Sequence, residues 1–443
     1  MGKTILEKAN SKKNTRHTDG IGSGFLQKAM AVTLFAVAVS PLGALFFKNN
    51  SFNILMYYTQ FMRAVSLLLI AFFALMLLNH AKSGQIPFKS SVKKIKPENA
   101  MLILMMVWMF ISCMLADKPQ LAFLGDWRGE GFLTYVAYFA LYFCAYAIAD
   151  KDIFSKFFCL FTYVSYAAGI LGLMSQFNLI AIAANNDIPA SLFVNANHYG
   201  YYLVIAIIVS AYHFLSAAGP KKAIHGAGLF IIAFSLFLSR CRGAWLAGVL
   251  ALAGLTVFIT LRKDKKPLSA FTPIFITAVA FFSTIAVYSD FIGRLISIFN
   301  DVNAVISASE ARYNAGTARW LLWSIGIKLI PVHPVFGFGL DNLETPLLAN
   351  SIIHTNRVHN EYLNYFLTIG IPGSLAYLAF LFKILIKYLK KIREIDFFAL
   401  SVFFAVIAYL ASAFFGNTTP YVTPYLFIFM GYLSRGSHIR KPE

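Results

Sequence analysis

Apolar runs long enough to cross a lipid bilayer recur from Leu26 to Leu433, and they limit the possible folds of this chain more than any other feature. A helix needs about 20 predominantly apolar residues to span a hydrocarbon core about 30 Å thick. Only 13% of the residues are charged, well below the share of roughly 25% in soluble domains. The sequence therefore predicts an all-α, polytopic membrane protein.

We expect about twelve transmembrane helices. The expected spans are Leu26–Phe47, Phe52–Asn79, Ala100–Leu115, Phe132–Ala149, Phe154–Met174, Tyr199–Ser216, Ala223–Leu238, Ala244–Leu261, Ala270–Tyr288, Tyr362–Ile386, Phe397–Phe415 and Tyr421–Leu433. Residues 26–288 hold the first nine helices and residues 361–434 the last three, while residues 289–360 form one long extracytoplasmic loop. Residues 1–25 are expected to form a basic cytoplasmic tail rather than a removable signal peptide, and residues 435–443 a second cytoplasmic tail.

The net charge of +19 reflects orientation in a membrane rather than nucleic-acid binding. If the N-terminus is cytoplasmic, 27 of the 38 Lys and Arg residues fall on inner segments, as the positive-inside rule requires. This distribution predicts that both termini are cytoplasmic and gives no reason to expect a nucleic-acid partner. The four Cys residues follow no disulfide or metal-ligand spacing, and we expect neither a metal nor another cofactor.

The positive charges left on the outer side need another explanation, because topology alone does not account for them. Most are Arg, whose planar guanidinium group binds phosphate oxygens in pairs better than Lys does. Arg63 lies within the second apolar run or at its outer end, where an unpaired charge is costly. We treat Arg63 as a candidate anion-binding residue; a side chain that snorkels to the interface is the alternative.

A very short outer turn joins two apolar runs and has the sequence Ser239-Arg240-Cys241-Arg242-Gly243. Two guanidinium groups in one turn repel each other unless an anion lies between them. A cytoplasmic turn is expected to carry such charges, whereas an outer one is not. We therefore favour Arg240 and Arg242 as an anion-binding pair over a merely solvated basic turn.

Two further outer segments carry polar and aromatic residues. The loop from Gly125 to Gly131 places Trp127 and Arg128 between glycines, so it could bind a sugar by stacking and hydrogen bonding, or form an interfacial turn with a Trp anchor. Asn195 and Asn197 precede the sixth apolar run, where helix capping is their expected role, and His198 follows them directly.

The long segment from residue 289 to 360 is expected to contain an amphipathic helix that lies along the membrane. Trp320, Trp323 and neighbouring aliphatic residues favour this helix, and Pro331 ends it. Ordered loops of this length usually have a function.

The same segment ends in His354, Arg357, His359 and Asn360, at the point where the chain enters the membrane again. A histidine with an ordinary pKa of about 6.5 can accept a proton from a sugar hydroxyl. We favour His359 for this role and His354 less, with interfacial packing as the alternative for each. Arg357, Asn360 and His354 are expected to contact the anion or the glycan.

These segments together resemble the O-antigen ligase and polymerase group of bacterial membrane glycosyltransferases, which have a GT-C-like fold and include lipopolysaccharide O-antigen ligases and Wzy-type polymerases. The resemblance covers roughly Gly125 to Gly373. In order, it rests on Gly125-Asp126-Trp127-Arg128-Gly129-Glu130-Gly131, Asn195-Ala196-Asn197-His198, Ser239-Arg240-Cys241-Arg242-Gly243-Ala244-Trp245-Leu246, Arg319-Trp320-Leu321-Leu322-Trp323 with His333-Pro334-Val335-Phe336-Gly337-Phe338-Gly339, and His359-Asn360-Glu361-Tyr362-Leu363 with Gly370-Ile371-Pro372-Gly373.

The resemblance implies transfer of a glycan from an undecaprenyl-pyrophosphate-linked oligosaccharide to a sugar acceptor on a lipid or a growing glycan. The reaction would occur at the outer face of the bacterial cytoplasmic (inner) membrane, without a metal. By position, Arg242 would bind the pyrophosphate and His359 would activate the acceptor hydroxyl, while Arg128 and Arg357 would be supporting contacts. The family pattern has a single Arg before Gly in the short turn, so Arg240 is an addition.

The main alternative is a polytopic transporter or flippase of a lipid-linked glycan. Proton-coupled carriers commonly place carboxylates within their spans, whereas none of the expected spans has an Asp or Glu in its interior. The candidate residues also gather at one face and not at the midplane, where transporters bind their substrates. The sequence therefore favours an enzyme and leaves polymerase and ligase equally open.

Overall fold

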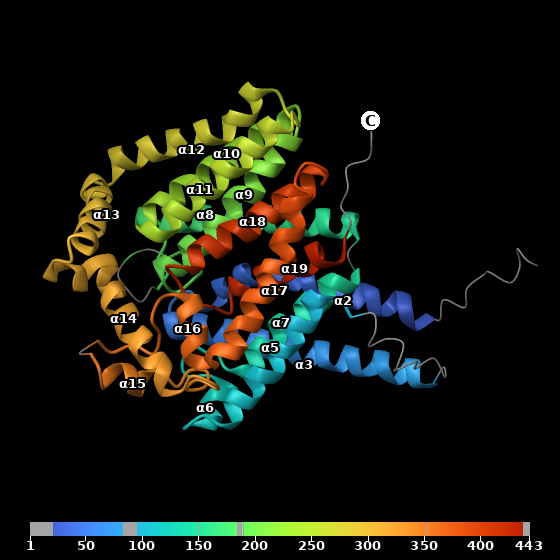
Figure 1. The fold of residues 1–443 in the computed structure, drawn as a ribbon. Coiled ribbons are helices and arrows are strands. Elements are labelled where there is room, and N and C mark those ends of the chain that lie inside the picture. Colours follow the sequence, from blue (N-terminus) through green and yellow to red (C-terminus); the bar gives the residue numbers. More distant parts are fainter. Residues whose placement is uncertain are drawn as a thin grey trace, which may run out of the picture.

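The computed structural model describes residues 21–82, 95–148, 150–183, 188, 190–351 and 353–436. In these ranges the chain forms helices joined by turns and loops (Figure 1), which confirms the all-α prediction. Residues 1–20 and 437–443, which make up most of the two tails expected from the sequence, lie outside the described residues.

Nine helices in the described part of the chain are long and apolar enough to cross a membrane, and each falls on a run predicted from the sequence. They are α2 (Ile21–Gly43), α3 (Ser51–Lys82), α5 (Pro97–Met114), α8 (Lys151–Gln176), α9 (Ala196–Ser216), α10 (Pro220–Leu238), α11 (Arg242–Leu261), α12 (Pro267–Val287) and α17 (Gly370–Lys390). A 3-10 turn, η1 (Ala44–Phe47), continues α2. Three of these helices begin with a proline, at Pro97, Pro220 and Pro267. Proline costs no helical hydrogen bond there, because the N–H groups of the first turn have no partner within the helix.

Three shorter helices occupy the remaining predicted spans. The helices α7 (Phe132–Ile148) and α18 (Phe397–Ala413) are apolar and have 17 residues each, and α19 (Thr423–Arg435) has only 13. Every residue from Thr423 to Ser434 is buried, and α19 packs mainly against α7. Since α19 is enclosed by other helices, its short length does not have to match a lipid bilayer. The total of twelve spans stays a prediction.

The sequence predicts one helix from Tyr362 to Ile386, and this prediction is wrong. The structure has two helices there, α16 (Glu361–Thr368) and α17, with Gly370 in the left-handed region at φ +68°. The carbonyl oxygens of Leu367 and Thr368 accept the backbone N–H groups of Phe338 and Gly339, at 2.8 and 2.9 Å. The helix therefore ends because the turn before Leu340 takes up its last carbonyl groups.

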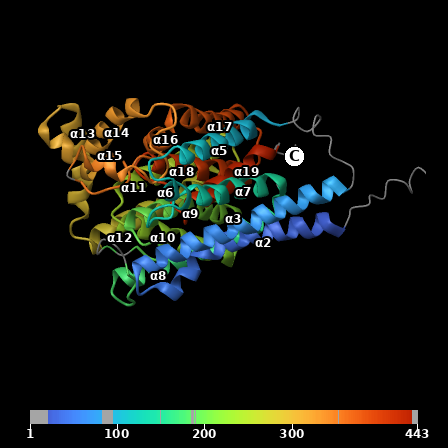
Figure 2. The same cartoon turned by 90° about the horizontal axis from the view of Figure 1, so that it is seen from below.

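The long segment after α12 folds into short helices that gather at one end of the bundle, opposite the start of α2 and the end of α3 (Figures 1 and 2). These are α13 (Phe291–Ile306), η2 (Glu310–Asn314), α14 (Ala315–Leu329), η3 (Ile330–Val332) and α15 (Glu344–Leu348). The helix predicted around Trp320 is present as α14. The helix α13 was not predicted from the sequence; in it Ile292, Ile296 and Phe299 are exposed at helical spacing.

Candidate active site

Four segments that are far apart in the sequence, together with Leu55 on α3, enclose a polar cavity of about 70 Å³. They are the loop between α6 (Pro119–Leu124) and α7, the start of α9, the end of the long segment before α16, and the chain before α19. The lining residues are Leu55, Trp127, Arg128, Glu130, Val194, Asn195, Asn197, His198, Tyr201, His359, Asn417, Thr418, Thr419, Pro420 and Tyr421. Three residues predicted from the sequence, His359, Arg128 and Trp127, thus meet in one cavity.

His359 is held in a strained backbone conformation, with φ at +54°. The next residue, Asn360, caps α16 by accepting the Leu363 N–H at 3.0 Å, so its side chain is used by the helix. The Nδ1 atom of His359 lies 3.0 Å from the Asn417 side-chain nitrogen. Burial, and then the charges of Arg319, Arg128 and Arg357, lowers the pKa of His359 to about 3. His359 is therefore neutral at physiological pH.

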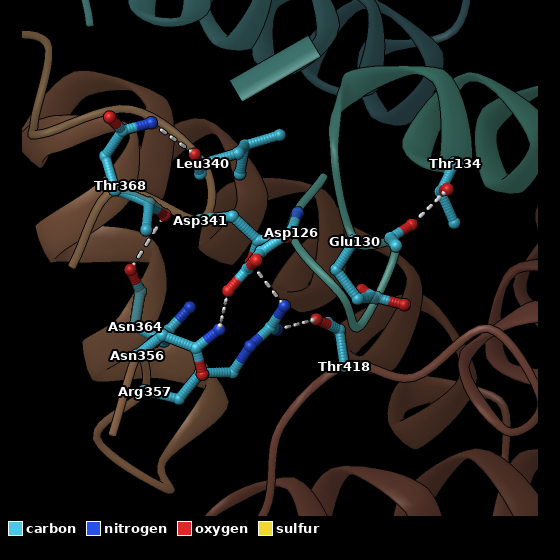
Figure 3. Close-up of polar contacts among 12 residues, drawn as sticks. Asp126, Glu130, Thr134, Leu340, Asp341, Asn356, Arg357, Asn364, Thr368 and Thr418 are labelled. Atoms are coloured by element: carbon cyan, nitrogen blue, oxygen red, sulfur yellow. Dashed lines mark hydrogen bonds and ion pairs between the residues drawn. The ribbon is translucent and has the colours of Figure 1, made fainter. Parts of the chain in front are cut away.

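The loop from Gly125 to Gly131 forms one wall and is tied to the rest of the site by hydrogen bonds (Figure 3). The Asp126 backbone N–H donates to Asp341 at 2.9 Å, and the Asn356 side chain donates to Asp126 at 3.3 Å. The Arg128 guanidinium group lies over the Trp127 ring, 4.6 Å from its centre. Burial, and then the charge of Arg357, lowers the pKa of Arg128 to about 10, so Arg128 stays cationic.

Gly129 gives a test of how closely this loop is fitted to its surroundings. Its φ is +68°, and an added Cβ would lie 2.3 Å from the Thr59 side chain. Gly129→Ala is expected to cost about 1–2 kcal/mol in backbone strain, and about 1–3 kcal/mol more from the clash. The matched control is Gly129→Ala in a Thr59→Ala background, in which the Cγ2 and Oγ1 atoms that the new Cβ would approach to 2.3 Å are absent, and each loss is measured against its own parent protein. Thermal unfolding in detergent should show a larger loss for Gly129→Ala in the wild-type background; equal losses in the two backgrounds would contradict the close fit.

Arg357 is only 2% exposed and does not line the cavity, and Figure 3 shows its guanidinium group beside Asp341 and Thr418. Its guanidinium group pairs with Asp341 at 2.6 Å and donates to Thr418 at 3.2 Å. Since Thr418 lines the cavity and Asp341 holds the loop at Asp126, Arg357 joins two walls of the site. Its charge also acts on both His359 and Arg128.

Four buried polar atoms on the cavity wall have no hydrogen-bond partner within the described ranges of the chain. They are Oε2 of Glu130, Nε of Arg128, Oδ1 of Asn417 and Oγ1 of Thr419. Buried polar groups are nearly always paired in folded proteins, and an unpaired group costs free energy. The cavity is therefore suited to a ligand with several hydroxyl groups.

A second, larger pocket of about 290 Å³ has two cationic side chains in an otherwise mainly apolar wall. Arg242 pairs with Asp301 at 2.7 Å and donates to Ser297 at 2.6 Å. Arg319 is the other cation. The remaining lining residues are Gly243, Leu246, Ile298, Val302, Val305, Ile306, Ala315, Gly316, Trp320, Trp323 and Phe415. Such a pocket can bind an anion that carries an apolar chain.

The two pockets are separated by a thin wall. Tyr201 lines the first pocket, and its hydroxyl group donates to the carbonyl oxygen of Phe415, which lines the second, at 2.6 Å. Arg319 lines the second pocket, and its charge lowers the pKa of His359 in the first. An anion beside Arg319 would thus lie close to His359.

Four other residues named by the sequence analysis line neither pocket. Arg240 lies over the ring of Tyr288, 4.4 Å from its centre, and Arg63 donates to the Leu124 carbonyl oxygen at 2.5 Å, at the start of the Gly125 loop. Asn360 is the helix cap described above, and His354 is exposed. Asn195, by contrast, does cap α9 as predicted, since it accepts the Asn197 N–H at 2.8 Å.

Four residues that line the pockets were not predicted as site residues from the sequence: Glu130, Arg319, Asn417 and Tyr421. Glu130 and Arg319 both lie in motifs noted for other reasons. The polar run Asn417-Thr418-Thr419 directly before an apolar helix was an available signal for a site at the membrane surface. The hydrogen bond between Tyr421 and His198 depends on a contact between distant segments, which no local pattern indicates.

Comparisons with known proteins place part of the chain near one family. The model of the O-antigen ligase family matches residues 227–378, a range that contains Arg242, Arg319 and His359. An uncharacterized protein of Haemophilus influenzae is 22% identical over 242 residues, which make up 51% of this chain and 59% of the relative. The match thus spans about three fifths of the relative's length. The chain is a helical membrane protein, and its residues 227–378 match the O-antigen ligase family.

Proposed function

We propose that this protein is a glycosyltransferase that moves a glycan from an undecaprenyl-pyrophosphate-linked donor to a sugar hydroxyl, at the outer face of the bacterial cytoplasmic membrane. The observation that supports this best is the pair of adjacent pockets with Arg319 beside the wall between them. One pocket offers cations in an apolar wall, and the other offers a neutral histidine in a polar wall.

The donor is proposed to bind in the second pocket. Its pyrophosphate would displace Asp301 from Arg242 and lie between Arg242 and Arg319, while the first isoprene units pack on Trp320, Trp323 and other apolar side chains. The first sugar would then extend toward the wall that separates the two pockets. Arginine suits this role because its fixed fork of N–H groups matches phosphate oxygens.

The acceptor sugar is proposed to bind in the first pocket, with its attacking hydroxyl at His359. The hydroxyl oxygen forms a bond to the anomeric carbon, and the bond from that carbon to the phosphate oxygen breaks. The lipid pyrophosphate leaves with the electron pair, stabilised by Arg242 and Arg319, and the hydroxyl proton passes to His359. If Nε2 of His359 accepts the hydroxyl proton, Nδ1 of the same ring must already carry a hydrogen. A half-turn of the Asn417 amide then places Oδ1, which has no partner in the described structure, where it accepts a hydrogen bond from Nδ1–H.

Donor binding is expected to make His359 a stronger base. In the free protein, burial and three arginines lower the pKa of His359 to about 3, so its neutral form persists down to that pH. A bound pyrophosphate beside Arg319 adds negative charge, which favours the protonated imidazole and raises this pKa. The acid limb of kcat should therefore lie at a higher pH than the acid limb of kcat/KM for the donor. A limb of kcat/KM near pH 6.5 that disappears in His359→Asn would contradict this expectation.

The proposal is tested with purified protein in detergent, a lipid-pyrophosphate-linked oligosaccharide and EDTA, because metal independence is part of the proposal. A ladder of repeat-unit multiples from the donor alone would identify a polymerase. Transfer only after a lipid A-core acceptor is added would identify a ligase. If neither product forms, with or without added Mg²⁺, the proposal fails and a carrier of lipid-linked glycan becomes the better account.

A further inference from the structure

Glu130 is a buried carboxylate with one oxygen atom in use and one free. The residue is 2% exposed, and its Oε1 accepts the Tyr138 hydroxyl at 2.6 Å. Its Oε2 is buried and makes no hydrogen bond of ordinary length and angle to the described residues, and the Thr418 hydroxyl acts on this carboxyl group more weakly than Tyr138 does. Glu130 lines the same cavity as His359 and Arg128, so this oxygen is available to a ligand there.

The surroundings of Glu130 act on its carboxyl group in opposite directions. Burial raises the pKa of Glu130, while the positive charge of Arg357 and hydrogen bonds from Tyr138 and Thr418 oppose this rise. The neighbouring Thr418 hydroxyl accepts from Arg357 and also contacts Tyr135. With its Oε1 held by Tyr138, the side chain is fixed, and its free oxygen needs no reorganisation to accept a hydrogen bond.

We propose that Oε2 of Glu130 binds a sugar hydroxyl in the cavity and so helps to select and position the sugar that reacts there. This inference rests on the proposed function. The ligand that fits is a neutral sugar unit, because the other polar atoms available on the wall are a guanidinium Nε, the end of the Asn417 amide that His359 does not use, and a hydroxyl oxygen. Trp127, which is 45% exposed, adds an aromatic surface at the edge.

A second buried glutamate offers a matched comparison. Glu361 is also 2% exposed, but both of its oxygens are used, by Tyr377 and Tyr409 at 2.8 Å each. Glu361 does not line the cavity. Glu361→Gln therefore removes a buried carboxylate from the same region without removing a free acceptor atom from the ligand site.

The test measures steady-state kinetics of transfer with Glu130→Gln, in which the atom facing the cavity becomes an N–H donor. The donor is lipid-linked oligosaccharide extracted from the bacterium that makes this protein. The acceptor is the lipid A-core of the same bacterium or, for a polymerase, the non-reducing end of the same oligosaccharide. KM for one of these two sugars should rise about ten-fold or more, the effect of one hydrogen bond to a charged group. The change in kcat should stay below three-fold, and Glu361→Gln should leave both KM values within two-fold.

Varying donor and acceptor separately assigns the bound hydroxyl to one of the two sugars. A raised acceptor KM places it on the acceptor, and a raised donor KM places it on the donor glycan. If both KM values are unchanged in Glu130→Gln, the inference is wrong, although wild-type transfer would still support the proposed function. If wild-type protein transfers nothing, the proposed function itself fails.

Folding is checked separately from binding. Thermal unfolding in detergent should give Glu130→Gln a melting temperature close to that of Glu361→Gln, since each loses one buried carboxylate. Should Glu130→Gln not fold, Glu130→Asp replaces it, because it keeps the charge but withdraws the oxygens by one methylene. Its KM should then rise for the same sugar, and an unchanged KM would overturn the inference.

Discussion

His359→Asn is expected to lower kcat for glycan transfer by about 10²- to 10⁴-fold, the usual contribution of a general base. Asparagine is the informative replacement, because His359 has φ at +54° and asparagine tolerates the left-handed region better than alanine does. The variant removes the imidazole without adding backbone strain. A radiolabelled or fluorescent lipid-linked donor would report the product directly.

The control for this variant is His333→Ala. His333 lies in the same long segment, packs edge-on against Phe338 with ring centres 4.6 Å apart, and lines neither pocket. It should keep kcat within about two-fold, a change of less than about 0.5 kcal/mol in the barrier. Full activity in a folded His359→Asn protein would remove His359 from the chemistry and, with it, the proposed mechanism.

Arg242→Ala is expected to reduce kcat/KM for the donor by about 10²- to 10³-fold, as the loss of one group that stabilises developing charge typically does. Stability should change little, because the Arg242 pair with Asp301 is partly exposed, at 19% and 30%, and such pairs contribute about 1 kcal/mol or less. Arg242→Lys keeps a charge but loses the paired N–H geometry, so its activity should be intermediate.

Two further variants separate anion binding from structure. Arg294→Ala removes an arginine of α13 that pairs with Asp290, the residue just before this helix. Arg294 lines neither pocket, so kcat/KM for the donor should hardly change. Asp301→Asn should lower the donor KM several-fold, because it removes the carboxylate that competes with pyrophosphate for Arg242, while its amide oxygen can still accept the Gly316 N–H. If Arg242→Ala and Arg294→Ala behave alike, Arg242 does not bind the donor.

Sequence patterns predict the long helices well, because apolar length alone decides which segments can cross a bilayer. They fail at Gly370, where tertiary hydrogen bonds from the turn before Leu340 end α16, although the local sequence reads as one continuous run. They also cannot tell that α19, with 13 residues, is enclosed by its neighbours.

The types of residue in the candidate site could be predicted from the sequence, but their arrangement in space could not. His359 and Arg242 could be predicted as candidates because their residue types and positions suit proton transfer and anion binding. Their placement in two pockets beside Arg319, the ion pair of Arg357 with Asp341 and the unpaired oxygen of Glu130 depend on how separate segments pack together, for example Asp126 with Asp341, 215 residues apart. A single sequence contains no local signal for such contacts.

The most direct test of this account is a cryo-electron microscopy structure of the His359→Asn protein in lipid nanodiscs with the undecaprenyl-pyrophosphate-linked donor. We expect the pyrophosphate within hydrogen-bond distance of both Arg242 and Arg319, the prenyl chain against Trp320 and Trp323, and the first sugar directed toward residue 359. A donor bound elsewhere in the bundle, with Arg242 still paired to Asp301, would contradict the account.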